Sequence, residues 1–193
     1  MARPREFDVE KVLREAMEVF WEKGFDGTSF ADVETRTGVK KASLFAAYGD
    51  KRSLFLKALA AYQESARDAI RSGLAAGSPR DAIRCWFASA AGLAKGDCAR
   101  RGCLQVNAIV ELGPHDADVA ALAREHTALV REALAEAIGR GQQRGELRTD
   151  VPAATLASYL MTSLHGLSIG GKAGMDADDV DRVADVTLST LDP

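Results

Sequence analysis

Apolar residues recur at steps of three and four along most of the chain, which is the spacing of one face of an α-helix. The first run, from Asp8 to Lys23, places Val12, Ala16 and Phe20 on one face with charged residues between them, and Gly24 ends it. No run of alternating β-branched residues marks a strand. The pattern predicts an all-α protein.

Capping residues divide the remaining pattern into helices. The side-chain oxygen of Thr28 is expected to cap the second helix, and Asp50 the fourth. Ser78 and Pro79 form a cap followed by a first-turn proline, whereas the polar stretch 96–102 is expected to be a loop. The nine predicted helices cover residues 8–23, 29–37, 40–46, 51–72, 79–95, 103–112, 117–143, 152–172 and 177–191.

Charge is unevenly distributed along the chain, whose formal net charge is −3. Between Arg36 and Lys57 there are six basic residues and one acidic residue, Asp50, so this segment carries 6 − 1 = +5 and the remainder −8. A basic patch on an acidic chain suits a site-specific duplex binder, because the patch anchors phosphates while the rest stays soluble. An ordinary solvated charged face is the alternative.

The sequence shows no targeting segment, no membrane span and no metal-binding spacing of cysteines and histidines. The first seven residues lack the apolar stretch of a secretory signal, and no later run reaches the ~20 apolar residues of a membrane span. We therefore expect a soluble, cytoplasmic protein without a membrane partner. Three cysteines and three histidines are scattered, so we expect free thiols, no metal site and no cofactor.

The segment from Glu34 to Phe45 has the parts of a helix-turn-helix. Gly38 supplies the turn, and Val39 and Leu44 are expected to be buried. The side chains expected on the accessible side are Lys40, Lys41, Ala42, Ser43 and Ala46. A three-helix core that does not bind DNA would also show a glycine turn.

A longer stretch, from Val12 to Leu59, resembles the N-terminal domain of TetR/AcrR-family repressors. The matching runs are residues 16–29, 38–39, 43–45 and 48–55, and the run 102–104 is similar to one subgroup. The resemblance implies a homodimer that represses from a palindromic operator and is released by a small-molecule effector. It implies a helix-turn-helix domain over 1–50 and an effector-binding and dimerisation bundle over 51–193, connected by the 51–72 helix.

The same resemblance implies the DNA contacts. Thr28 would cap the second helix near a phosphate, residues 41–47 would face the major groove, and Lys51 would meet the DNA backbone. The full set of expected contacts is Thr28, Ser29, Lys40, Lys41, Ala42, Ser43, Phe45, Ala46, Ala47, Tyr48 and Lys51.

Three positions depart from the family's pattern. Phe45 stands where the family usually has tyrosine, and Ala46 and Ala47 stand where it often has polar residues. Base discrimination is therefore expected from Lys40, Lys41 and Ser43, together with methyl contacts from the alanines to thymine.

Effector-binding candidates lie in the C-terminal helices. Asn107 and Glu111 are four residues apart on an apolar helix and share a face with Cys103, which either lines a cavity or meets solvent. Trp86, Met161 and His165 are candidates for the cavity wall, with an ordinary core role as the alternative. His126, on a charged helix, is expected to be exposed.

The helix over 152–172 is almost wholly apolar or small, with Leu156, Leu160, Leu164 and Leu167. This is more apolar surface than one face needs, which favours packing against a second subunit; a central position within one subunit is the alternative.

Three rival functions remain open. Cys98 and Cys103 frame two arginines that would lower a thiol pKa, so a redox-responsive regulator with a reversible disulfide is one alternative. An all-α enzyme would need a pair such as His115 with Asp116, or Cys103 with His126, but no motif fixes such geometry, and no catalytic residue is expected. The third is an adaptor. The basic segment favours the DNA-binding interpretation, because neither an enzyme nor an adaptor requires it.

Overall fold

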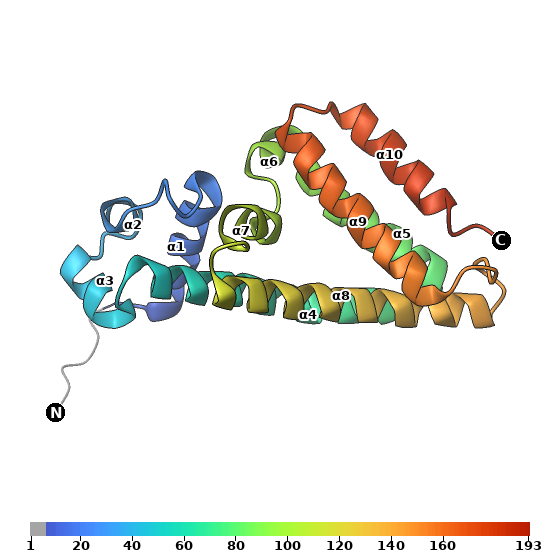
Figure 1. The fold of residues 1–193 in the computed structure, drawn as a ribbon, viewed down its shortest axis with the longest axis horizontal. Coiled ribbons are helices and arrows are strands. Elements are labelled where there is room, and N and C mark those ends of the chain that lie inside the picture. Colours follow the sequence, from blue (N-terminus) through green and yellow to red (C-terminus); the bar gives the residue numbers. More distant parts are fainter. Residues whose placement is uncertain (1–6) are drawn as a thin grey trace. The chain divides into compact units, whose positions relative to one another are not determined.

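The computed structural model describes residues 7–193; residues 1–6, which contribute to the prediction that no secretory signal is present, lie outside the described residues. Across 7–193 the chain forms helices and no β-strand, which confirms the predicted all-α class (Figure 1). None of the helices in this range has the length and apolarity of a membrane span.

The helices are α1 (Val9–Lys23), α2 (Phe30–Thr37), α3 (Lys41–Tyr48), α4 (Lys51–Ala75), α5 (Pro79–Ala91), the 3-10 turn η1 (Gly92–Ala94), α6 (Gly96–Arg101), α7 (Leu104–Leu112), α8 (Ala117–Gln143), α9 (Ala153–Lys172) and α10 (Ala177–Ser189). The nine predicted helices are all present. The short helix α6 replaces the loop predicted over 96–102, because Ala99 is buried and α6 contacts α9, so tertiary packing overrides a weak local signal.

The chain forms two compact units. Unit 1 contains the residues up to Ser65 together with Asn107–Ala123, and unit 2 contains Ala66–Val106 and Arg124–Pro193. The boundaries between the units fall within α4, α7 and α8. Unit 1 therefore extends beyond residue 50 and includes a segment that is distant in sequence. The functional division at residue 50 stays a prediction.

Aromatic rings form the centre of unit 1. Phe20 of α1 lies 5.1 Å from Phe55 of α4 between ring centroids, in an edge-to-face arrangement. Phe25, in the loop after α1, lies 5.2 Å from the same Phe55 ring. Such edge-to-face pairs add to the free energy gained by burying the rings. They hold the start of α4 against α1 and the loop that leads to α2.

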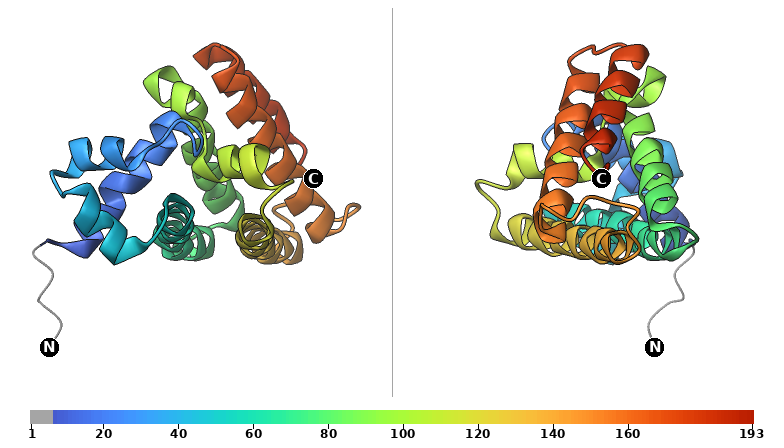
Figure 2. Two further views of the ribbon diagram at one scale, coloured as in Figure 1. Left: turned by 60° about the vertical axis from the view of Figure 1, so that its left-hand side comes forward. Right: turned by 90° about the vertical axis from the view of Figure 1, so that its right-hand side faces the viewer.

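The core of unit 2 combines α5, α9 and α10 with the unit 2 parts of α4 and α8. Ile83, Phe87, Leu134 and Leu160 have no exposed surface. Figure 2 shows α9 and α10 side by side, and these two helices are in contact. Where α9 meets η1, a Cβ atom on Gly171 would lie 2.5 Å from the carbonyl oxygen of Ala94, so this approach requires glycine.

Candidate nucleic-acid interface and effector-binding bundle

The start of α2 differs from the sequence prediction. Ser29, not Thr28, is the N-cap, and it forms a capping box with Asp32 in which each side chain accepts from the other's backbone N–H. The Thr28 hydroxyl donates instead to the carbonyl oxygen of Gly24 at 2.7 Å, and Thr28 is buried. The prediction that Thr28 caps the second helix is therefore wrong, because its hydroxyl closes the end of α1.

A carboxylate on α2 fixes the start of α3. Gly38 ends α2 in the left-handed conformation, with φ 71°, as the predicted turn requires. The N-cap of α3, Lys40, has no capping side chain, and Glu34 supplies the acceptor: its Oε2 accepts from the Lys41 N–H at 2.9 Å and its Oε1 from Lys40 Nζ at 3.1 Å. These bonds hold the pKa of Glu34 below its ordinary value, the Lys41 N–H first.

Glu34 was not among the functional residues predicted from the sequence. The sequence feature that could have revealed it is a carboxylate in the last turn of α2, seven residues before the first residue of α3. Because it joins two helices, Glu34 sets the angle at which α3 leaves the turn.

The outer face of α3 is free of acidic side chains. Leu44 and Tyr48 are buried and attach the helix to unit 1, as predicted for Leu44. Val39, for which burial was also predicted, is only half-buried. The exposed residues are Lys41, Ala42, Ser43, Phe45 and Ala46, while Ala47 is half-buried. The side chain of Phe45 is 59% exposed.

Two other predicted contact residues make internal contacts. The Tyr48 hydroxyl donates to the carbonyl oxygen of Val9 at 3.0 Å. Lys51 Nζ donates to the carbonyl oxygen of Phe25 at 2.9 Å and lies 4.3 Å from the centroid of its ring. A contact between either side chain and DNA therefore stays a prediction that requires exchange of these bonds.

Acidic residues outside the 36–57 segment neutralise much of its positive charge. Arg36 pairs with Glu22 at 2.6 Å, and Arg52 pairs with Asp116 at 2.6 Å. By contrast, the Lys41 side chain makes no ion pair within residues 7–193. The patch that α3 presents is therefore smaller than the sequence charge of +5 indicates, and Lys41 is its exposed cation.

Glu111 was predicted either to line a cavity or to meet solvent, and the structure shows a different role. Its Oε2 accepts from the Phe25 N–H at 2.9 Å and its Oε1 from the Asp26 N–H at 2.8 Å. Both carboxylate oxygens thus hold the loop between α1 and α2 within unit 1. Asn107 is half-buried in the same unit, and its effector role stays a prediction.

The other effector candidates lie in unit 2. Met161 is buried and Trp86 is partly buried against the unit 2 core. The Cys103 N–H donates to Ser168 Oγ at 3.1 Å, which joins the start of α7 to α9. His165 is half-buried on α9. Their role in effector binding stays a prediction.

His126 does not lie in the position that its sequence context indicated. It is half-buried, whereas exposure was expected from the charged residues beside it on α8. The expectation was wrong because the neighbouring charges belong to another face of the helix.

The two cysteines of the redox alternative are both free. Cys98 is exposed on α6, and Cys103 is partly buried just before α7. A disulfide between them stays a prediction.

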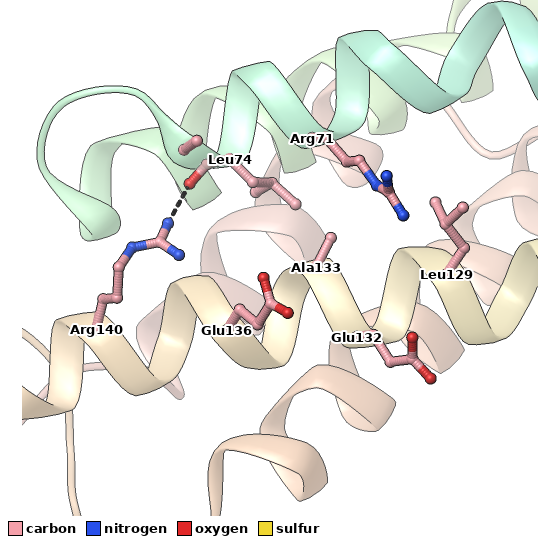
Figure 3. A pocket seen from close by; sticks show the side chains of 8 residues that line it. Arg71, Leu74, Leu129, Glu132, Ala133, Glu136 and Arg140 are labelled. Carbon is pink, nitrogen blue, oxygen red and sulfur yellow. Dashed lines mark hydrogen bonds between the residues drawn. The ribbon is translucent and has the colours of Figure 1, made fainter.

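A groove of about 370 Å³ lies between α4 and α8 of unit 2 (Figure 3). Arg71 of α4 and Glu132 and Glu136 of α8 line it with exposed charges of both signs. Arg140 donates to the carbonyl oxygen of Leu74 at 2.6 Å and so closes one end of the groove. Exposed charges of both signs are well solvated by water, so we assign no ligand to this groove.

Two family models match the chain. Residues 12–58 match the model described as "Bacterial regulatory proteins, tetR family". Residues 77–187, more than half of the chain, match "Tetracyclin repressor-like, C-terminal domain".

Curated relatives match over nearly the full length. The chain is 34% identical to the uncharacterized HTH-type transcriptional regulator YezE of Bacillus subtilis, over 100% of both chains. It is 28% identical to the HTH-type transcriptional repressor ComR of Escherichia coli, over 96% of this chain and 90% of that one.

Solved structures show the same fold. A cysteine-substituted form of the TetR family regulator CifR, in complex with a 26-base-pair operator duplex, has a TM-score of 0.83 and 30% identity, over 98% of this chain and 100% of that one. A TetR family regulator from Agrobacterium tumefaciens has a TM-score of 0.86 at 20% identity, over 95% of this chain and 97% of that one.

Proposed function

Because the chain belongs to the TetR family of helix-turn-helix transcriptional regulators, we propose that it is a repressor that binds a palindromic operator as a homodimer and is released by a small-molecule effector. Its place of action is then the cytoplasm, where the DNA lies, and no catalytic step is part of this function.

One observation carries the proposal: α3 presents an outer face without acidic side chains, with Lys41 and Ser43 exposed at its start. A recognition helix contacts base edges through its N-terminal residues, and lysine and serine are both used to read bases. Glu34 and Gly38 hold this helix at a defined angle to α2. These features support a helix that enters the major groove.

A second copy of the chain is the proposed occupant of the apolar face of α9 and α10. Of the seven large apolar side chains that are exposed within residues 7–193, four lie on these two helices: Tyr159, Ile169, Val183 and Val186. Three of the four line a shallow groove of about 440 Å³ between the helices. Clustered exposed apolar surface of this kind marks an interface.

The leucines of α9 that were predicted to contact a second subunit lie in or against the core of unit 2. Leu156, Leu160 and Leu167 are buried in the core of unit 2, and Leu164 packs against it. The proposed dimer face therefore consists of the remaining side of α9 and the outer side of α10.

The experiment that tests the function starts from a randomised duplex library from which the protein selects its site. We expect a palindromic duplex with two half-sites, bound by two chains, with an affinity that falls as salt rises and is lost on a scrambled duplex. Equal affinity for the selected and the scrambled duplex would contradict the proposal. Val186→Glu should weaken both dimerisation and duplex binding, while Val110→Glu, at an exposed position on α7, should leave the dimer intact.

A further inference from the structure

Phe45 lies on the exposed side of α3, with 59% of its surface accessible to solvent. Leu44 and Tyr48, which are buried, hold the inner side of the same helix against unit 1. Phe45 follows Lys41 by four residues and Ala42 by three, so these three residues share one strip of the helix surface. The strip places an aromatic ring beside the exposed cation of α3.

Phe30, the first residue of α2, holds the Phe45 ring from one side. The two ring centroids are 6.3 Å apart and the ring planes meet at 63°, in an edge-to-face arrangement. Such pairs are favourable beyond the area that they bury, and this one restricts the orientations open to Phe45. Phe30 is itself half-buried. The ring of Phe45 is therefore supported from α2 while more than half of its surface stays available to a partner.

The chemistry of a phenyl ring limits what this surface can contact on DNA. The ring has no hydrogen-bond donor or acceptor, so it can neither bond a phosphate nor pair with the polar groups of a base edge. A phosphate pressed against it would lose hydration without compensation. In the major groove the apolar group on the base edges is the C5-methyl of thymine, which apolar side chains, phenylalanine included, contact.

The neighbouring side chains leave the ring free to reach such a methyl group. Ala42 and Ala46 are exposed and small, and the ring of Phe45 projects farther from the helix axis than their methyl groups do. Lys41, in the same strip, supplies a positive charge that is complementary to the duplex. The exposed ring is thus continuous with the face of α3 that is proposed to enter the groove.

We propose that Phe45 is a specificity-determining residue of the operator site and that its ring contacts the C5-methyl group of one thymine in each half-site. The inference rests on the proposed function and deepens it, because it names the chemical group that this side chain reads. The deoxyribose is the other apolar part of DNA. A ring that packed on the sugar would increase affinity without any preference for a methylated base.

Replacement of thymine by deoxyuridine in the selected duplex tests the proposal, because it removes the methyl group and nothing else. Each thymine is replaced in turn, in both half-sites together, and the affinity of the intact protein is measured by fluorescence anisotropy. We expect one such replacement to weaken binding at least about tenfold, or about threefold for each methyl group. At the same position a 5-methylcytosine–guanine pair should bind at least about tenfold more tightly than a cytosine–guanine pair.

The ratio of the affinities for the thymine and deoxyuridine duplexes assigns the methyl contact to a residue. We expect Phe45→Ala to bring this ratio at that position to about one, whereas Val110→Ala, at an exposed apolar position on α7, should keep the ratio of the parent. The ratio does not depend on the fraction of active protein, so a variant that folds only in part still gives it.

A parent protein that binds every deoxyuridine duplex as tightly as the thymine duplex would overturn the proposal without any variant. An equal ratio in the parent and in Phe45→Ala at every thymine would overturn it as well, and a Phe45→Ala protein that is weaker on all duplexes alike would place the ring on the sugar. If the parent selects no duplex from the library, the proposed function itself fails. A selected duplex with no methyl dependence leaves that function standing and rejects only the role of Phe45.

Discussion

The carboxylate of Glu111 and the backbone N–H of Phe25 are 2.9 Å apart although 86 residues separate them along the chain. The same side chain also accepts the N–H of Asp26, so the end of α7 holds the loop that leads from α1 to α2. A Cβ atom on Gly24 would lie 3.1 Å from Glu111, and Gly24 has φ 75°, so glycine is required where α1 meets this carboxylate.

Glu111→Gln should loosen this loop. In a glutamine an NH2 group, which is a donor, replaces one of the two accepting oxygens and would face one of the two N–H groups. We expect amide hydrogen exchange at Phe25 and Asp26 to accelerate about tenfold, which corresponds to the loss of about 1.4 kcal/mol. Val110→Ala, at an exposed position on the same helix, is the matched control. Unchanged exchange in Glu111→Gln would mean that the carboxylate does not hold the loop.

Asp116 should matter more to stability than Asp118. Asp116 accepts two hydrogen bonds from Arg52 and also caps α8 through the N–H groups of Asp118 and Val119, whereas Asp118 accepts only one bond from Arg52. Arg52 accounts for most of the lowering of the Asp116 pKa to about 2. We expect Asp116→Ala to lower the free energy of unfolding by about 1–2 kcal/mol and Asp118→Ala by less. Equal losses in urea titrations would contradict this order.

Ser29→Ala should destabilise α2. The substitution removes the side chain that caps the helix and faces Asp32, which costs about 1 kcal/mol in comparable helices. Ser29→Asp keeps a capping acceptor, but places a second carboxylate beside Asp32, and should be intermediate in thermal unfolding. A Ser29→Ala protein as stable as the parent would show that the capping box does not contribute.

The half-buried histidines make stability depend on pH. Their folded-state pKa values are lowered, so the unfolded chain binds protons first, and this contribution is present above about pH 6.5 and lost as the pH falls below it. We expect the melting temperature of the unliganded protein to fall between about pH 7 and about pH 5.5. The fall should be smaller in the double variant His126→Gln, His165→Gln. An equal fall in both proteins would assign the pH dependence to other groups.

Local signals predicted most of the fold, and contacts between distant segments account for the differences. The end of α1, the cap of α4 at Asp50 and the Ser78–Pro79 start of α5 follow from neighbouring residues, and the structure has all three. The contact between Glu111 and Phe25 has no local signal, because its partners meet only after the chain has folded. Burial of His126 likewise depends on which face of α8 meets the core.

The groove face of α3 was predicted correctly at its apolar anchor, Leu44, and at its exposed residues Lys41 and Ser43. The predicted cap of α2 at Thr28 was wrong, because a local pattern cannot distinguish a cap on the next helix from a bond to the preceding one. Neither result changes the proposal that the function depends on the start of α3.

The most direct test of that function is the affinity of Lys41→Ala and Ser43→Ala for the selected duplex, measured by fluorescence anisotropy against the parent and against Arg131→Ala, which removes an exposed charge from unit 2. If α3 reads the operator, Lys41→Ala should lose at least about tenfold in affinity, and each of the two variants should alter the preferred sequence. Arg131→Ala should bind like the parent. Unchanged affinity and sequence preference in both α3 variants would contradict the account.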